Sequence, residues 1–228
     1  MITYLTSLDQ QVLLAINGLH TAYLDQAMWL VSSRLSWLLI LLAFLCTLRG
    51  KGWRHAALAI LAIALTVLVA DQVSSGLIKH LVERPRPTHE PALAGLVHTV
   101  NGYTGGPYGF VSSHAANAFG VALIIGLMMR SRTALWALVA WALLQCYSRV
   151  YLGVHYVGDI LGGAIVGLLA AWLVGWLWGK AHRHWPQKVS TYNFTPNDGR
   201  LIAHAVAVTT ISIAILAALL PIAAPNPS

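Results

Sequence analysis

Charged residues are scarce in this sequence of 228 residues. Asp, Glu, Lys and Arg together make up 9% of it, whereas 57% of its residues are hydrophobic. Soluble domains carry roughly 25% charged residues, so a chain this poor in charge cannot cover a water-facing surface of its size. The composition therefore argues against a soluble domain and predicts an integral membrane protein.

Cysteine and acidic residues are also few. Cys46 and Cys146 lie in apolar stretches without a partner at zinc-binding spacing, so we expect buried free thiols rather than a disulfide framework. Seven acidic against fourteen basic residues leave a net charge of +7. No nucleic-acid-binding motif accompanies this excess. We therefore expect no nucleic-acid partner and attribute the excess to the basic loops of a membrane protein.

Long apolar stretches predict the architecture. A helix needs about 20 apolar residues to cross a bilayer. Residues 4–18 are too polar for that, but their apolar side chains recur at helical spacing, which is typical of an amphipathic helix lying at the membrane interface. We therefore expect an all-α fold, with this interfacial helix at the start of a single membrane domain over residues 1–228. About six transmembrane helices are predicted, at roughly 27–48, 54–78, 113–130, 133–152, 157–179 and 201–221.

Basic residues are distributed unevenly along the chain. Nine of the fourteen fall in the first, third and fifth connections between the expected spans, namely Arg49, Lys51, Arg54, Arg130, Arg132, Lys180, Arg183, Lys188 and Arg200. Cytoplasmic loops carry such an excess, so the second and fourth connections and both termini are expected on the outer side. The other five bases lie against this rule, which suggests that they have another task. They are Arg34, Lys79, Arg84, Arg86 and Arg149.

Three segments hold most of the polar residues near the expected membrane edge, and all three fall on the outer side. They are Lys79-His-Leu-Val-Glu-Arg-Pro-Arg-Pro87, Phe110-Val-Ser-Ser-His-Ala-Ala-Asn117 and Ser148-Arg-Val-Tyr-Leu-Gly-Val-His-Tyr-Val-Gly-Asp159. Lys79, Arg86 and Arg149 would supply three cations for a tetrahedral dianion. Arginine in particular offers a planar fork of donors that matches phosphate oxygens. The set is therefore typical of a phosphate-binding site.

The same segments carry groups suited to nucleophilic catalysis. Ser112 and Ser113 precede an apolar helix, where a hydroxyl can cap the helix and the free N–H groups can hold an anion. His155 and Asp159 are four residues apart, so they share a face if a helix begins near His155. The aspartate can then fix one imidazole nitrogen and leave the other free to attack. His114 remains as an acid for the departing oxygen.

Several residues keep more than one interpretation. Arg84 is compatible with a headgroup contact or with an ion pair to Glu83 or another acid, and Asp71 with a place inside the bundle or a helix cap. Arg34 stays unassigned. The Pro- and Gly-rich segment 84–111 is either an exposed connector or a selector of lipid headgroups. A metal site on the two histidines and Asp159 is disfavoured because the neighbouring cations would repel a divalent ion.

The motifs together resemble those of the type 2 phosphatidic acid phosphatase family. The matching pattern is K-x6-R-P, a Ser-x-His triplet and S-R-x5-H-x3-D, and the resemblance covers roughly residues 20–180, leaving 201–221 as an additional C-terminal span. The family usually has Pro-Ser-Gly-His in the second segment, where this chain has Val111 and Ser113 in place of the proline and glycine.

This resemblance implies a metal-independent hydrolase that acts on a lipid phosphate or diphosphate and needs no cofactor. His155 would be the nucleophile that forms a phosphohistidine, His114 the acid and then the base, and Asp159 the residue that orients His155. The expected phosphate-binding residues are Lys79, Arg86, Ser112, Ser113 and Arg149.

Analogy with the bacterial branch of this family suggests undecaprenyl diphosphate as the substrate. Lipid A, phosphatidylglycerol phosphate and phosphatidic acid are the alternatives. A vanadium-dependent haloperoxidase and a non-catalytic lipid-binding or transport protein are more remote ones. We expect the protein in a bacterial inner membrane, with the active site facing the periplasm or exterior and the bilayer and its lipid substrate as partners. The sequence does not indicate an oligomeric state.

Overall fold

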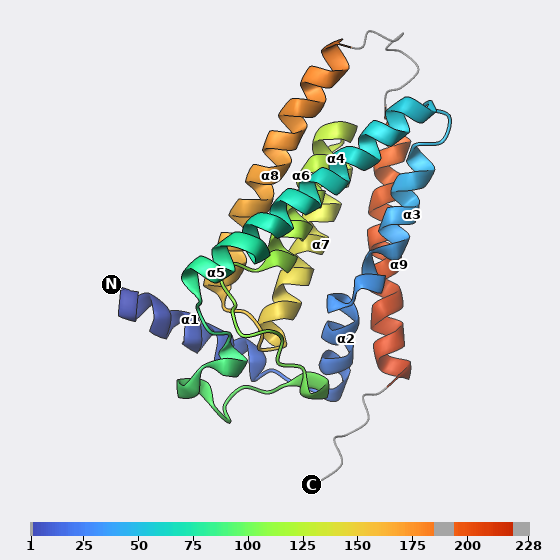
Figure 1. Cartoon of the computed structure of the whole chain (residues 1–228). Helices are drawn as coiled ribbons and strands as arrows, with labels where there is room; N and C mark the ends of the chain where they lie inside the picture. The colour runs from blue at the N-terminus through green and yellow to red at the C-terminus, as the bar shows by residue number, and fades with distance from the viewer. Residues whose placement is uncertain (1, 185–193, 221–228) are drawn as a thin grey trace.

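The computed structural model describes residues 2–184 and 194–220, which form a bundle of helices joined by short connections and one long loop. Helix α6 packs on α4, α7 and α8, while the pair α2 and α3 packs on α9 (Figure 1). These helices are α2 (Ala22–Ser32), α3 (Leu38–Thr47), α4 (Trp53–Asp71), α6 (Ser113–Met129), α7 (Arg132–Tyr151), α8 (Val157–His184) and α9 (Pro196–Leu219).

Helices α6 and α8 approach each other at backbone level. A Cβ atom added at Gly163 would overlap the carbonyl oxygen of Ser112, and one added at Gly167 would overlap that of Ala116. Small residues allow such close approach between membrane helices. The contact begins at Ser112, so it also sets how the second polar segment lies against α8.

The first expected span, 27–48, is bent rather than straight. Between α2 and α3 lies the short 3-10 helix η1 (Arg34–Trp37), and the two arms enclose a bend of 64°. The Ser33 hydroxyl donates to the Leu30 carbonyl at 2.8 Å, and the Ser36 hydroxyl donates to the Val31 carbonyl at 2.9 Å. Serine side chains that bond to nearby carbonyls in this way compete with regular helix geometry and often bend helices.

Within the described residues, three helical stretches are long and apolar enough to cross a membrane: Trp53–Val82, Val157–Lys180 and Pro196–Leu219. The bent pair α2 and α3 makes a fourth if it counts as one span, and α6 is apolar but shorter. The prediction of a helical membrane protein is confirmed. The count of six spans is not, because the first expected span is bent, the third is short, and α7, which covers the fourth, is not among the described stretches that are apolar enough. Of the two free cysteines, Cys146 is buried as expected, whereas Cys46 is exposed on α3.

The span that begins with α4 ends in irregular helix just before the first polar segment. A π-helical stretch, η2 (Gln72–Ile78), follows α4 and runs into the short helix α5 (Lys79–Val82). Such π-helical turns are rare and frequently lie at functional sites. Asp71 ends α4, and its Oδ1 accepts a hydrogen bond from the Ser75 hydroxyl at 3.4 Å. Asp71 therefore contributes a side-chain hydrogen bond within the π-helical stretch.

The N-terminal segment forms the expected amphipathic helix, α1 (Ile2–Asn17), which lies across one end of the bundle (Figure 1). Asp9, Leu13 and Asn17 recur every four residues and face the protein, where the Leu13 side chain is fully buried. Leu5, Leu8 and Val12 remain exposed. Helix α1 thus docks by one face and leaves an apolar stripe open, as an interfacial helix would.

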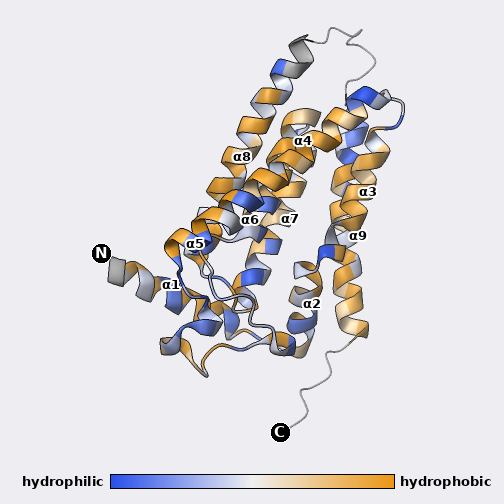
Figure 2. Cartoon of the chain, in the orientation of Figure 1, coloured by the Kyte–Doolittle hydropathy of each residue, from blue (hydrophilic) through white to orange (hydrophobic). Residues whose placement is uncertain are grey.

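The two ends of the bundle differ in chemistry. The connections α3–α4 and α6–α7, the last turns of α8 and the start of α9 share one end, so most of the bases expected on the cytoplasmic side gather there (Figure 1). Lys188 lies outside the described residues. At the other end, hydrophilic segments surround the long loop between α5 and α6 (Figure 2). The three polar segments and α1 meet at that second end.

Candidate active site

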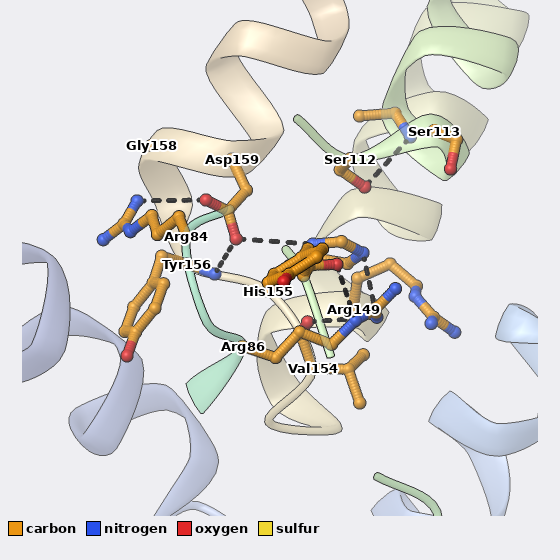
Figure 3. Close-up of polar contacts among 12 residues, drawn as sticks. Arg84, Arg86, Ser112, Ser113, Arg149, Val154, His155, Tyr156, Gly158 and Asp159 are labelled. Carbon is orange, nitrogen blue, oxygen red and sulfur yellow. Dashed lines mark hydrogen bonds and ion pairs between the residues drawn. The ribbon is translucent and has the colours of Figure 1, made fainter. Parts of the chain in front are cut away.

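His155 lies in the tight connection between α7 and α8, two residues before α8 begins, and its side chain is 1% exposed. Its ring Nδ1 lies 3.4 Å from Oδ2 of Asp159, which sits in the first turn of α8 (Figure 3). The expected pairing is present even though α8 starts after His155. The turn of chain before α8 supplies the geometry that we had expected from a single helical face.

The carboxylate of Asp159 is fully buried and held on both oxygens. Oδ2 accepts the backbone N–H of Tyr156 at 3.0 Å as well as facing His155, and Oδ1 accepts Nη1 of Arg84 at 3.0 Å (Figure 3). A buried carboxylate needs such partners because removing it from water is costly. These contacts leave Asp159 one orientation, in which Oδ2 points at the imidazole.

Arg86 contacts the opposite side of the imidazole. Its Nη1 lies 3.3 Å from Nε2 of His155 and 3.3 Å from the carbonyl of Val154, and its Nε donates to the carbonyl of Tyr108 at 3.1 Å. A guanidinium has donors only, so Nε2 of His155 must be the acceptor. The ring proton then resides on Nδ1, facing Asp159. This tautomer leaves the lone pair of Nε2 on the side of the ring that faces Arg86, away from Asp159.

Arg149 is buried at the end of α7 and is held by two hydroxyl groups. Its Nη1 donates to the Ser32 hydroxyl, and its Nη2 donates to the Tyr103 hydroxyl at 3.2 Å. The guanidinium also lies over the Tyr103 ring, 5.5 Å from its centroid. Burial would raise the pKa of Tyr103, but the neighbouring charges of Arg149 and Arg86 lower it on balance. Tyr103 therefore lies beside the cations that we expect to bind phosphate.

The Ser-Ser-His segment joins the site at the start of α6. The Ser112 hydroxyl caps α6 by accepting a backbone N–H of its first turn at 3.4 Å, and the Ser112 N–H donates to the carbonyl of Asp159 at 2.9 Å. The Ser113 hydroxyl accepts from Nζ of Lys79 at 3.2 Å and from the Ser75 hydroxyl at 3.1 Å. Serine in place of the family's usual glycine thus gives Lys79 a fixed partner.

His114 follows in the first turn of α6 and is exposed. Its imidazole lies within the electrostatic range of three cations and of the His155 ring. The cations are Arg149, Arg86 and Lys79. An accessible histidine beside a buried one and three cations is placed to exchange protons with a ligand held between them. All eight residues expected to form the site are therefore brought together. No three His, Cys, Asp or Glu side chains within residues 2–184 and 194–220 are placed to share a metal ion.

The long loop between α5 and α6 forms one wall of this site. It supplies Arg84, Arg86 and Tyr103. It also passes close to the pair of His155 and Asp159, called the dyad below, since a Cβ added at Gly109 would lie 2.7 Å from Oδ2 of Asp159. The Gly109 N–H donates to the carbonyl of Arg84 at 2.8 Å, which holds the loop in place. Of the two interpretations of segment 84–111, the exposed connector is therefore wrong for this part of it.

Three contributors were missed by the motifs: Asp9, Ser32 and Ser75. Arg84, left open by its sequence position, pairs with Asp9 and Asp159 rather than with Glu83. A signal for Asp9 was available, since it shares the buried face of an amphipathic helix with Leu13. Arg34 is exposed on η1.

The buried position of His155 predicts how pH affects stability. Burial lowers the pKa of its imidazole well below the ordinary value of 6.5, and the charges of Arg86, Arg149 and Lys79 lower it further. Below pH 6.5 the unfolded chain then binds a proton that the folded protein does not bind. Stability that is fully present above this pH is therefore lost as the pH falls. One pH unit lower, the loss from this residue is about 1 kcal/mol.

Thermal unfolding in detergent measures this loss. Between about pH 7.5 and about pH 5.5, the Tm of the wild type should fall further than that of His155→Asn, which cannot titrate. Equal falls in the two proteins would mean that His155 is already protonated in the folded state.

Comparisons with known proteins match this chain to a family. A model of the PAP2 superfamily matches residues 55–184. The lipid A 4'-phosphatase of Bacteroides thetaiotaomicron is 39% identical over 175 residues, which are 76% of this chain and 78% of that protein. The undecaprenyl-diphosphatase of Bacillus subtilis is 29% identical over 73% of this chain and 82% of that protein.

A solved structure shares the fold. The crystal structure of a transmembrane PAP2 type phosphatidylglycerolphosphate phosphatase from Bacillus subtilis matches with a TM-score of 0.59 and 26% identity, covering 78% of this chain and 87% of that one. The family match covers more than half of the chain and contains all eight expected site residues. The chain therefore belongs to the PAP2 superfamily and is a membrane lipid phosphatase.

Proposed function

We propose that this phosphatase removes the 4'-phosphate of lipid A through a phosphohistidine formed on His155. The observation that carries the catalytic part is the arrangement of the His155 ring, with Nδ1 toward Asp159 and Nε2 toward Arg86. An imidazole held in one tautomer, with its free nitrogen facing phosphate-binding cations, is an activated nucleophile. Binding alone would require the cations but not the dyad, which disfavours a non-catalytic lipid-binding protein.

In the first step, Nε2 of His155 attacks phosphorus in line with the bond to the lipid oxygen. The N–P bond forms as that P–O bond breaks, and His114 gives its proton to the departing oxygen. Arg86, Arg149 and Lys79 stabilise the charge on the three equatorial oxygens. Fixed donors of this kind are usually the largest contribution to such catalysis. Asp159 stabilises the positive charge that develops on the imidazole of His155.

In the second step, water replaces the enzyme at phosphorus. His114, now neutral, accepts a proton from the attacking water, the new O–P bond forms, and the N–P bond to His155 breaks. Inorganic phosphate leaves, with His155 neutral and His114 protonated again. These two steps need no metal ion, because the cations Lys79, Arg86 and Arg149 supply the positive charge that a metal would otherwise supply.

Lipid A is favoured as the substrate by relatedness. Besides the Bacteroides protein, a lipid A 4'-phosphatase of Porphyromonas gingivalis is 36% identical over 80% of this chain. Undecaprenyl diphosphate, suggested above by analogy, is the second candidate and is supported by the more distant Bacillus relative at 29% identity. The cations recognise a terminal phosphate in either lipid. The loop that carries Tyr103 beside Arg149 is the segment we expect to distinguish the headgroups.

The site lies at the end of the bundle opposite most of the basic connections, near α1 (Figure 1). If those connections are cytoplasmic, as the distribution of positive charge in membrane proteins favours, the site faces the periplasm of a bacterial inner membrane. A lipid phosphate at headgroup depth could then enter laterally, with its acyl chains remaining in the bilayer.

The substrate assignment predicts a ranking in a phosphate-release assay with purified protein in detergent. We expect kcat/KM for lipid A to exceed that for undecaprenyl diphosphate, phosphatidylglycerol phosphate and phosphatidic acid by about tenfold or more, the factor given by 1.4 kcal/mol of differential transition-state binding. Equal kcat/KM values for all four lipids would mean that the site distinguishes them only by how accessible their phosphate is. A preference for undecaprenyl diphosphate would reverse the assignment of substrate and leave the chemistry in place.

A further inference from the structure

Arg84 lies outside the phosphate-binding set, yet it contacts the catalytic dyad. Its Nη1 lies 3.0 Å from Oδ1 of Asp159, on α8 (Figure 3). Its Nη2 lies 2.8 Å from Oδ2 of Asp9, on α1. The side chains of Arg84 and Asp9 are 23% and 13% exposed, and that of Asp159 is 0% exposed. One guanidinium therefore connects the N-terminal helix to the residue that orients His155.

The guanidinium of Arg84 is held from three sides. Besides its two carboxylate partners, it lies over the ring of Tyr156, 4.0 Å from the ring centroid. The second oxygen of Asp9, Oδ1, accepts the backbone N–H of Gly158 at 3.0 Å, at the start of α8. A Cβ added at Gly158 would lie 2.7 Å from Oδ2 of Asp9. Asp9 thus reaches the first turn of α8 directly and through Arg84.

These contacts divide the two oxygens of Asp159 between two partners. Arg84 binds Oδ1, so Oδ2 remains for Nδ1 of His155. Without Arg84, a fully buried carboxylate would lose its only ion pair to a permanently charged group among the described residues. Electrostatic interactions are strong in such a water-poor environment, so this loss affects both the charge and the orientation of Asp159.

Asp9 in turn holds Arg84 in this position. A bound phosphate dianion would attract any neighbouring guanidinium, and the carboxylate of Asp9 attracts Arg84 from the opposite side. Asp9 is also outside residues 55–184, the part of the chain that the family model matches. The family motifs therefore assign no role to this contact.

We propose that Asp9 and Arg84 are a positioning pair that holds the Asp159–His155 dyad in its reactive arrangement, with α1 supplying Asp9 from the surface of the bundle. The inference rests on the proposed role of His155 as nucleophile. Both side chains of the pair are engaged with protein groups, Arg84 with two carboxylates and Asp9 with Arg84 and the Gly158 N–H. Their effect should therefore fall on the rate of phosphoryl transfer to His155 and leave lipid binding nearly unchanged.

The test compares Asp9→Asn, Arg84→Gln, the double variant and Arg84→Lys, as full-length proteins in detergent. Partners that orient a functional group typically contribute about 10- to 100-fold. We expect kcat and the single-turnover rate of phosphohistidine formation to fall by about this factor in either single variant, with KM within about twofold. The double variant should lose little more than Arg84→Gln, because the two residues act as one unit. Arg84→Lys should recover part of the loss.

Glu83→Gln is the matched control, since it removes one negative charge beside Arg84 from an exposed side chain. It should behave as the wild type, and all variants should elute as folded protein. A purely structural pair would lower the Tm without changing the rate in the folded fraction. That result, multiplicative losses in the double variant, or an equal loss in Glu83→Gln would overturn the proposal. Retained activity in a His155 variant would instead overturn the proposed function on which it rests.

Discussion

Replacement of His155 by asparagine should abolish turnover while leaving the protein folded. The amide of asparagine can still donate to Asp159 from roughly the place of Nδ1, but it has no atom at the place of Nε2. Nε2 is the ring atom that faces Arg86, at 3.3 Å. Loss of a nucleophile removes several orders of magnitude in rate, so we expect kcat to fall by at least about 1,000-fold.

Two measurements make this result decisive. Phosphate release from the lipid substrate gives the loss in kcat, and size-exclusion behaviour with Tm in detergent shows that the variant is folded. Rapid quenching of the wild type at high pH should also trap acid-labile phosphate on His155, and the variant should give none. A His155→Asn protein with a tenth of the wild-type rate, or equal trapping in both proteins, would sink the assignment of the nucleophile.

Substitution of His114 by alanine should slow lipid hydrolysis by about 100- to 10,000-fold, the usual range for a general acid or base. The residue is exposed in the first turn of α6, so alanine leaves the packing of the bundle unchanged. The loss should depend on the leaving group. A lipid alkoxide needs a proton as it departs, whereas a nitrophenolate leaves readily without one.

An aryl phosphate therefore separates the two roles of His114. With nitrophenyl phosphate, the His114→Ala protein should release a burst of nitrophenol equal to the amount of enzyme and then turn over slowly, because water has lost its base in the second step. The matched control is His89→Ala, which removes an exposed histidine of the long loop. If His114→Ala slows the burst itself as much as it slows lipid hydrolysis, the residue is not the acid.

The convergence of the site could be predicted because its spacing carries geometry. The motif residues lie at the ends of apolar stretches, as Lys79, Arg86, Ser112 and Arg149 do. The distribution of basic residues among the connections predicted that those ends lie on one side of the membrane. An imidazole four residues before an aspartate also leaves few arrangements, and the observed one pairs them as expected. The tautomer of His155 could not be predicted, since it follows from Arg86 on the far side of the ring.

Features that depend on distant partners could not be predicted. Arg84 meets Asp9 across 75 positions of sequence, and no local pattern links them.

The bend between α2 and α3 depends on whether Ser33 and Ser36 bond to nearby carbonyls or to water, which composition does not decide. The last helix begins at Pro196, earlier than expected, because Thr195 and Asp198 form a capping box. That signal lay in the sequence, but apolar content alone does not detect it.

The backbone contact between α6 and α8 has a mechanical consequence. His114 is carried by α6, while Asp159 is carried by α8 next to His155, and Gly163 and Gly167 bring the two helices together without intervening side chains. The bond from the Ser112 N–H to the Asp159 carbonyl links their ends at the site. Helices joined in this way tilt as one body when a bilayer thins or thickens. Changes in membrane thickness can therefore alter how a lipid arrives without altering the spacing between proton donor and nucleophile.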